Sequence, residues 1–337
     1  MRNVIIVGVH RGIQEIEPLD VKQEIGRAGR VGLDERGDAY ILLPRTKFTR
    51  YKNWCQNIPP ITSSMNDKDI LAFHIISEIS EGEIYDVPSL MQWYNRSLAA
   101  FQNNFLDRVD AEALLSKLEK IKVIEKIENI YKPTKLGRVA AYLYYSPYSI
   151  SSWYFNFNKI FTEKKIDDYS ISWALSNIPD NCNVFAGKDM QDIVKEFVSC
   201  CRNRNLIIND SCAFVGAIIY SCLSYCDDIG DHIKKKVKMD SERMFTALDM
   251  IDTMYSHWNK QVFWKKLQLR LEYEVTDEQT ELCMLKGIGG SRVRKLFDEG
   301  IRTLNDFVVK SSLVKDVLGE FLYNKIIIDN KKKLERC

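Results

Sequence analysis

The first 60 residues alternate between short apolar runs and one helical pattern. Continuous apolar runs at 4–7 and 39–43 are typical of strands in a parallel sheet, and residues 21–30 between them have the spacing of a helix. One helix and a few strands cannot bury both faces of a sheet. Residues 1–60 are therefore predicted to be a partial α/β lobe with at least one open strand edge.

Residues 61–148 show helical periodicity followed by two strands. Asp67 is a candidate cap for a helix that runs through Ile79, where apolar residues form a broad stripe. Further helices are predicted at 88–94, 98–105 and 111–120, and wing strands at 123–127 and around Tyr131. This order of elements predicts a winged-helix domain.

Residues 149–275 have helical spacing with no obvious catalytic constellation. Helices are predicted at 193–201, 212–226 and 241–258, with Asp240 or Ser241 as the cap of the last. The basic run at 234–238 precedes that helix, and a solvated loop is favoured over a grip on DNA. This segment makes the predicted fold class mainly α.

The segment 276–337 contains a glycine-rich turn between two helical patterns, which predicts a helix-hairpin-helix. Glycines let a hairpin backbone approach a phosphate and direct N–H groups at it, and neighbouring basic side chains add charge without reading bases. The alternative is a hairpin that only packs. The candidate nucleic-acid-binding residues here are Lys286, Gly287, Gly289, Gly290, Arg292, Arg294 and Lys295.

Composition narrows the class of protein. The 337 residues are 45% hydrophobic and 28% charged, which is globular, and the formal net charge of +2 means that nucleic-acid affinity would come from local patches. Nine cysteines without C-x-x-C pairs favour reduced thiols over a zinc site, so no metal is expected. No long apolar run or signal-peptide pattern is present, so we expect a cytoplasmic, nucleoid-associated or nuclear protein without a membrane partner.

The run at 23–30 (QEIGRAGR) carries the strongest chemical signal. Arg27 and Arg30, three apart on the predicted helix, suit contact with the phosphates of a nucleotide. An ATP-driven motor also needs a phosphate loop of the form G-x-x-x-x-G-K-S/T and an acidic box for the metal ion. Neither pattern occurs in the chain.

Three motifs resemble those of one helicase family. The run at 23–30 resembles motif VI of superfamily-two helicases, above all the archaeal Hjm-type repair helicases of the Ski-like branch. Residues 131–138 resemble that family's Y-x-P-T-x-L-G-R segment, and residues 285–301 resemble its C-terminal helix-hairpin-helix motif, with Gly290-Ser291 where a Gly-Arg pair is commoner. The order of partial RecA-like lobe, winged helix, ratchet bundle and helix-hairpin-helix covers nearly the whole chain.

The resemblance implies roles for individual residues. Gln23, Arg27 and Arg30 would face ATP from the second RecA-like lobe, with Arg30 as the arginine finger. An arginine and an aromatic side chain of the ratchet helix would step along the strand, and Arg243 and Trp258 are the candidates, although the family's Trp-Met pair is absent.

Two other segments leave alternatives open. Residues 10–19 stand where the family carries a strand-separating hairpin, so a short pin and a plain connector both remain possible, with the connector favoured. The winged helix would brace the motor, or contact the strand through Lys132, Lys135 or Arg138.

Two functions follow from these expectations. In the first, the chain is the C-terminal part of a 3′–5′ DNA helicase that acts in repair, recombination or replication. It would pair with a separate chain carrying the Walker motifs and bind ATP and Mg²⁺ only in that complex. In the second, it is an ATP-independent single-stranded DNA-binding or regulatory module derived from a truncated helicase gene. Single-stranded or forked DNA is the expected ligand in both.

Overall fold

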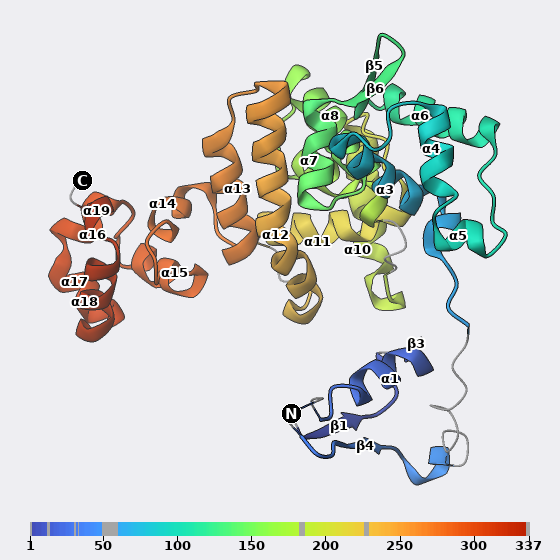
Figure 1. Cartoon of the computed structure of the whole chain (residues 1–337). Helices are drawn as coiled ribbons and strands as arrows, with labels where there is room; N and C mark the ends of the chain where they lie inside the picture. Colours follow the sequence, from blue (N-terminus) through green and yellow to red (C-terminus); the bar gives the residue numbers. More distant parts are fainter. Residues whose placement is uncertain are drawn as a thin grey trace. The chain divides into compact units, whose positions relative to one another are not determined.

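The computed structural model describes residues 2–11, 14–29, 32, 34–48, 60–181, 186–225 and 229–334. The chain divides into two compact units, residues 1–63 and 64–337. Helices far outnumber strands in the described part of the chain (Figure 1), which confirms the mainly α fold class.

The first unit contains a parallel pair of strands covered by one helix. Strand β1 (Asn3–Val7) pairs in register with β4 (Asp38–Leu42), and α1 (Pro18–Ile25) lies between them in sequence. Val21 of α1 and Val4 of β1 are buried. The alternate positions of both strands remain exposed, as expected where one helix covers one face; they are Ile5, Val7, Tyr40 and Leu42.

The segment before α1 contains a very short antiparallel pair. Strands β2 (His10–Arg11) and β3 (Gln14–Glu15) pair with His10 opposite Glu15. Residues 12 and 13 between them lie outside the described residues. The segment 10–19 thus contains a small hairpin, and its use as a strand-separating pin stays a prediction.

The predicted helix at 21–30 is wrong at both ends. Helix α1 begins at Pro18, whose fixed φ suits a first helical position, and it ends at Ile25. Gly26 and Arg27 lie in a turn, and Gly29 has a φ of +77° that a helix does not allow. Arg27 therefore lies after the helix rather than on it, and Arg30 lies outside the described residues.

The segment 61–148 contains the predicted helices and strand pair with small changes at their ends. Asp67 caps α3, accepting a hydrogen bond from the Asp69 backbone N–H at 2.8 Å. The predicted helix at 98–105 ends early, at Phe101. The elements are η3 (Ser64–Asn66), α3 (Lys68–Glu81), α4 (Val87–Tyr94), α5 (Leu98–Phe101), α6 (Arg108–Lys120), the hairpin of β5 (Ile124–Ile127) and β6 (Ile130–Pro133), and α7 (Lys135–Leu143) (Figure 1).

Close packing at the start of α7 accounts for the motif at 131–138. Thr134 caps α7, accepting from the Gly137 N–H at 3.1 Å and donating its hydroxyl to the Lys122 carbonyl at 2.7 Å. A Cβ at Gly137 would lie 2.0 Å from the Val123 carbonyl oxygen. Threonine and glycine are thus required here for joining the strand pair to the helix.

The middle of the chain is a helical bundle that shares one apolar core with the segment before it. That core runs without a break across residue 148, so the predicted domain boundary there stays a prediction. The elements are α8 (Pro147–Thr162), α9 (Asp168–Ser176), η4 (Pro179–Asn181), η5 (Lys188–Met190), α10 (Gln191–Asn203), η6 (Asp210–Cys212), α11 (Ala213–Leu223), α12 (Asp231–Ile251), the π-helical turn η7 (Asp252–Ser256) and α13 (Gln261–Tyr273).

Helix α12 corrects two predictions. It begins at Asp231, so the basic run at 234–238 is helical rather than a solvated loop, and Asp240 and Ser241 are not its cap. It ends at Ile251, because Asp252 begins a π-helical turn, so Trp258 does not lie on this helix. Lys234 is buried and forms an ion pair with Glu274 at 2.7 Å, the kind of partner that a buried lysine normally has.

The C-terminal segment has a core of its own, built around Leu282, Leu285, Ile288, Val293 and Phe307. Its elements are η8 (Asp277–Gln279), α14 (Thr280–Cys283), α15 (Gly290–Asp298), α16 (Leu304–Val309), α17 (Ser311–Leu318), α18 (Glu320–Asp329) and α19 (Lys331–Leu334).

Candidate nucleic-acid interface

The glycine-rich turn at 285–289 joins α14 to α15, and these three segments together form the hairpin. Two buried side chains hold the turn in place. Leu285 and Ile288 are buried in the C-terminal core, which fixes both sides of the turn. Gly290 begins α15 against the C-terminal end of α13, where a Cβ would lie 2.2 Å from the Tyr273 carbonyl oxygen. Gly290 thus serves packing, while Lys286 and Gly287 at the tip of the turn are exposed.

The basic side chains of the hairpin face two environments. Arg292 and Lys295 are exposed on α15, and Arg292 Nη1 donates to the Gly287 carbonyl at 2.7 Å. This bond uses one of the five N–H donors of a guanidinium and holds Arg292 beside the turn. Lys286, Gly287 and Arg292 are therefore brought together on one exposed surface.

Arg294 is placed differently from its neighbours. Its Nη1 donates to the Glu274 carbonyl at 3.2 Å, and its guanidinium lies 4.9 Å from the centre of the Tyr225 ring. The side chain is half-buried. Arg294 consequently ties the hairpin to the helical bundle, although the sequence groups it with Arg292.

Sequence reasoning missed Asn330, which is buried beside the hairpin. Its Oδ1 accepts from the Lys286 N–H at 2.8 Å, and its Nδ2 donates to the carbonyls of Lys286 at 3.0 Å and Ile326 at 2.8 Å. Asn330 stands in a run of polar and charged residues from Asp329 to Lys333, which normally lie on the surface, so nothing in the sequence marked it.

An ion cluster joins the helical bundle to the linker before the hairpin and was also missed. Glu274, which is 9% exposed, accepts hydrogen bonds from Lys234 and Lys238. Burial alone would raise the pKa of Glu274, but the two ammonium groups outweigh it and hold the pKa below its ordinary value. The basic run is therefore partly neutralised inside the protein.

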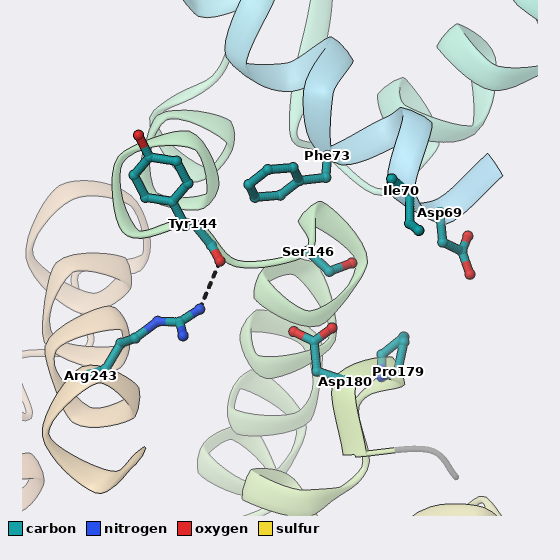
Figure 2. Close-up of a pocket in the computed structure, with 8 residues that line it drawn as sticks. All are labelled: Asp69, Ile70, Phe73, Tyr144, Ser146, Pro179, Asp180 and Arg243. Atoms are coloured by element: carbon teal, nitrogen blue, oxygen red, sulfur yellow. Dashed lines mark hydrogen bonds between the residues drawn. The ribbon is translucent and has the colours of Figure 1, made fainter. Parts of the chain in front are cut away.

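Arg243 lines a cavity of about 400 Å³ between α3, the turn after α7, η4 and α12 (Figure 2). Its Nη2 donates to the Tyr144 carbonyl at 2.7 Å and its Nε to the Leu143 carbonyl at 3.2 Å. A cation at the C-terminus of α7 also interacts favourably with the helix dipole. Arg243 therefore braces α12 against α7.

The same cavity contains two aromatic rings and two carboxylates. Phe73 and Tyr144 have ring centroids 6.0 Å apart, and Figure 2 shows Phe73 between α3 and Tyr144. The carboxylates are Asp69 from α3 and Asp180 from η4, and burial raises the pKa of Asp180. Carboxylates disfavour phosphate, so this cavity is a poorer candidate for contact with a nucleic-acid backbone than the hairpin.

Trp258 lies in an aromatic cluster. It stacks on Tyr154, with centroids 6.1 Å apart, and meets Phe161 edge-on at 5.3 Å. Its Nε1 donates to Asn158 Oδ1 at 3.4 Å. The structure thus places Arg243 and Trp258 in different surroundings, and the half-buried Trp258 ring has packing partners already.

The residues of the N-terminal motif are solvent-exposed where they are described. Gln23 is exposed on α1, and Arg27 is exposed in the following turn, where its Nε pairs with Glu24 at 3.0 Å. Arg30, the predicted arginine finger, lies outside the described residues.

Two further findings concern metals and membranes. Among the described residues, no group of three or more His, Cys, Asp or Glu side chains is placed to hold a metal ion. In that same part of the chain, no helix is both long and apolar enough to cross a membrane.

The chain is similar to archaeal helicases. It is 28% identical over 333 residues to the ATP-dependent DNA helicase Hel308 of Methanocaldococcus jannaschii, covering 94% of the chain and 27% of that protein. The identity to Hel308 of Thermoplasma acidophilum is 24% over 332 residues, covering 94% of the chain and 47% of the relative. For Hel308 of Methanococcus vannielii it is 24% over 406 residues, covering 97% and 51%.

These similarities confirm the resemblance to the C-terminal region of a Hel308-type superfamily-two helicase that the motifs indicated. The chain spans 27% to 51% of the length of these three relatives. No protein-family model matches it.

Proposed function

We propose that this chain is the nucleic-acid-handling C-terminal part of an ATP-dependent 3′–5′ DNA helicase of the Ski-like type, which acts in DNA repair, recombination or replication. The observation that carries the proposal is the similarity to Hel308 helicases over 94% of the chain. A match over nearly the whole chain includes both the N-terminal motif and the C-terminal hairpin. It therefore favours a role shared with these helicases over a resemblance in a single motif.

In this proposal the hairpin holds the phosphate backbone of single-stranded DNA. The exposed backbone at Gly287 and the start of α15 provide N–H donors. The side chains of Lys286, Arg292 and Lys295 provide positive charge. These groups contact phosphates rather than base edges, so binding is independent of sequence. Arg294 and Gly290 hold the hairpin against the helical bundle.

The N-terminal motif acts on a nucleotide held by an ATP-binding half outside this sequence. Arg27 is free to turn toward that half, because its pair with Glu24 is exposed and such surface pairs contribute about 0–1 kcal/mol. Arg30 would stabilise the charge that develops as the γ-phosphate leaves, and arginine fingers accelerate such reactions by ~10³ to 10⁵. Gln23 would contact the same nucleotide, and Mg²⁺ would be bound with it by the other half.

Arg243 and Trp258 are the candidate strand contacts on the helical bundle. Arg243 keeps N–H donors beyond those that it gives to Leu143 and Tyr144. Trp258 offers one partly exposed ring, and a base stacked on an aromatic side chain contributes about 1–3 kcal/mol. Both roles are secondary to the hairpin, because both side chains already have partners within the chain.

A salt titration with labelled single-stranded DNA tests the hairpin. Each phosphate contact on a single strand contributes about 0.7 to the slope of log K against log salt concentration. We expect Lys286→Ala/Arg292→Ala to weaken binding and to lower the slope by about 1.4. Lys188→Ala/Lys195→Ala is the matched control, because it also removes two exposed positive charges, at and near α10 and outside the hairpin, and should leave the slope unchanged.

Two outcomes would count against the proposal. If the double variant keeps the wild-type slope, the hairpin only packs. If the chain binds single strands and no ATP-binding half confers ATP hydrolysis, it is the ATP-independent binding or regulatory module instead.

A further inference from the structure

The end of the chain folds against the hairpin. Ile326 of α18 lies directly beneath Gly287, where a Cβ would be 3.1 Å from Ile326 Cγ1. Asn330, one helical turn later, forms hydrogen bonds with the backbone of Lys286 from the same side. Two residues four apart therefore fix the C-terminal helices to the tip of the hairpin.

The geometry at Asn330 requires an amide. Its oxygen faces the Lys286 N–H, and its nitrogen faces two carbonyl oxygens, those of Lys286 and Ile326. A carboxylate would face both carbonyls without a proton to donate, and an apolar side chain would leave the Lys286 N–H and carbonyl without these bonds. Asn330 is 4% exposed, so water does not replace it.

Three lysines directly follow Asn330 and form α19 together with Leu334. Lys331, Lys332 and Lys333 are all exposed, and Lys333 Nζ donates to the Met284 carbonyl at 2.7 Å, one residue before the hairpin begins. The Asn330 clamp and this bond hold α19 next to Lys286. Positive charge from the hairpin and from the end of the chain thus meets on one surface.

We propose that α19 and the hairpin form one continuous binding surface for the phosphate backbone of single-stranded DNA. Lys331 and Lys332 contact phosphates next to those held by Lys286 and Arg292, and Asn330 is the positioning residue that sets the distance between the two groups. The inference rests on the proposed DNA binding by the hairpin and extends it by a second set of contacts.

The first test is a salt titration of the full chain with a labelled single strand. Lys331→Ala/Lys332→Ala should lower the slope of log K against log salt concentration by about 1.4, because two phosphate contacts are lost. The ratio of wild-type to variant affinity should then fall about sevenfold between 50 and 200 mM salt. Lys188→Ala/Lys195→Ala is the control, because it removes the same formal charge from exposed positions at and near α10 and should bind like wild type.

The second test uses Asn330→Ala, which leaves the net charge unchanged. We expect it to lower the slope as far as the lysine double variant does, and we expect the two changes together to lower it no further. Arg292→Ala should still weaken binding in the Asn330→Ala background, because the hairpin remains folded on its own core. If Asn330 only stabilised the fold, Asn330→Ala would instead reduce the effects of Arg292→Ala and of Lys331→Ala/Lys332→Ala alike.

The outcomes separate the inference from the function on which it rests. If Lys331→Ala/Lys332→Ala matches its control while Lys286→Ala/Arg292→Ala lowers the slope, the extended surface is refuted and DNA binding by the hairpin stands. If neither double variant changes the slope, both are refuted. Additive effects of Asn330→Ala and the lysine variant would refute the positioning role of Asn330.

Discussion

Replacing Glu274 by glutamine should destabilise the junction between α12 and the linker that leads to the hairpin. The carboxylate accepts hydrogen bonds from Lys234, whose side chain is 1% exposed, and from Lys238. Glu274→Gln keeps the shape of the side chain but removes the charge that neutralises two ammonium groups. Lys234 would then carry a buried charge without its partner.

The size of the effect follows from the burial of Lys234. Removing one partner of a buried ion pair typically costs about 3–5 kcal/mol, because the remaining charge is left without compensation. Replacing both partners by apolar residues of similar volume is often neutral or stabilising. We therefore expect Glu274→Gln to lose about 3–5 kcal/mol, and Glu274→Leu/Lys234→Met to recover most of that loss.

Urea denaturation followed by circular dichroism measures these differences, and pH provides an independent check. The pKa of Glu274 is lower in the folded protein than its ordinary value of 4.5. Its contribution is therefore fully present above about pH 4.5 and is lost as pH falls through the folded pKa. The stability difference between wild type and Glu274→Gln should shrink below pH 4.5.

A matched control is Glu278→Gln, because Glu278 is exposed just beyond the linker and should change stability by less than about 0.5 kcal/mol. If Glu274→Gln is no more destabilising than Glu278→Gln, the buried ion pair does not hold this junction together, and the proposed role of Glu274 fails. It also fails if the apolar pair is less stable than Glu274→Gln.

Three further changes test other parts of the structure. Gly137→Ala should destabilise the protein by about 1–3 kcal/mol, because the new Cβ would lie 2.0 Å from the Val123 carbonyl; a melting temperature equal to wild type would contradict this. Hydrogen bonds from the backbone N–H groups of Arg302 and Thr303 lower the pKa of Asp306 to about 2. The contribution of Asp306 to stability should therefore be lost as pH falls from about 4 to about 2. Asp306→Asn should remove this pH dependence of stability in acid titrations. Arg243→Met should lower stability by about 1–2 kcal/mol through loss of its bonds to two carbonyls, and an unchanged urea midpoint would show that Arg243 does not brace α12.

Local signals predicted much of the helical and strand structure. Asp67 starts α3 where its side chain caps the first turn, and the strand predicted at 123–127 forms β5 (Ile124–Ile127). Both depend on residues close in sequence, so the pattern contains the required information. The winged-helix, RecA-like and ratchet assignments stay predictions.

The errors came from interactions between distant residues or from backbone conformation. The predicted start of α12 was wrong because a run of lysines is expected to be solvated unless its counterion is known. The counterion here, Glu274, lies 40 residues away from Lys234. The end of α1 was misplaced because spacing alone does not show that Gly29 has a positive φ.

The candidate site shows the same limit. Arg292 and Arg294 are equivalent in sequence, yet only packing against Tyr225 reveals that Arg294 faces the bundle. Asn330 gave no signal at all, since its partner Lys286 lies 44 residues earlier.

ATP hydrolysis on mixing with an ATP-binding chain decides whether this protein is one half of a helicase motor. The chain alone and a chain carrying the Walker A and B motifs would be assayed separately and together, with single-stranded DNA present. We expect hydrolysis only in the mixture, reduced by Arg30→Ala and by Arg27→Ala, because both arginines act on a nucleotide held by the other half. Hydrolysis by the purified chain alone, or a mixture whose activity ignores both substitutions, would contradict the account.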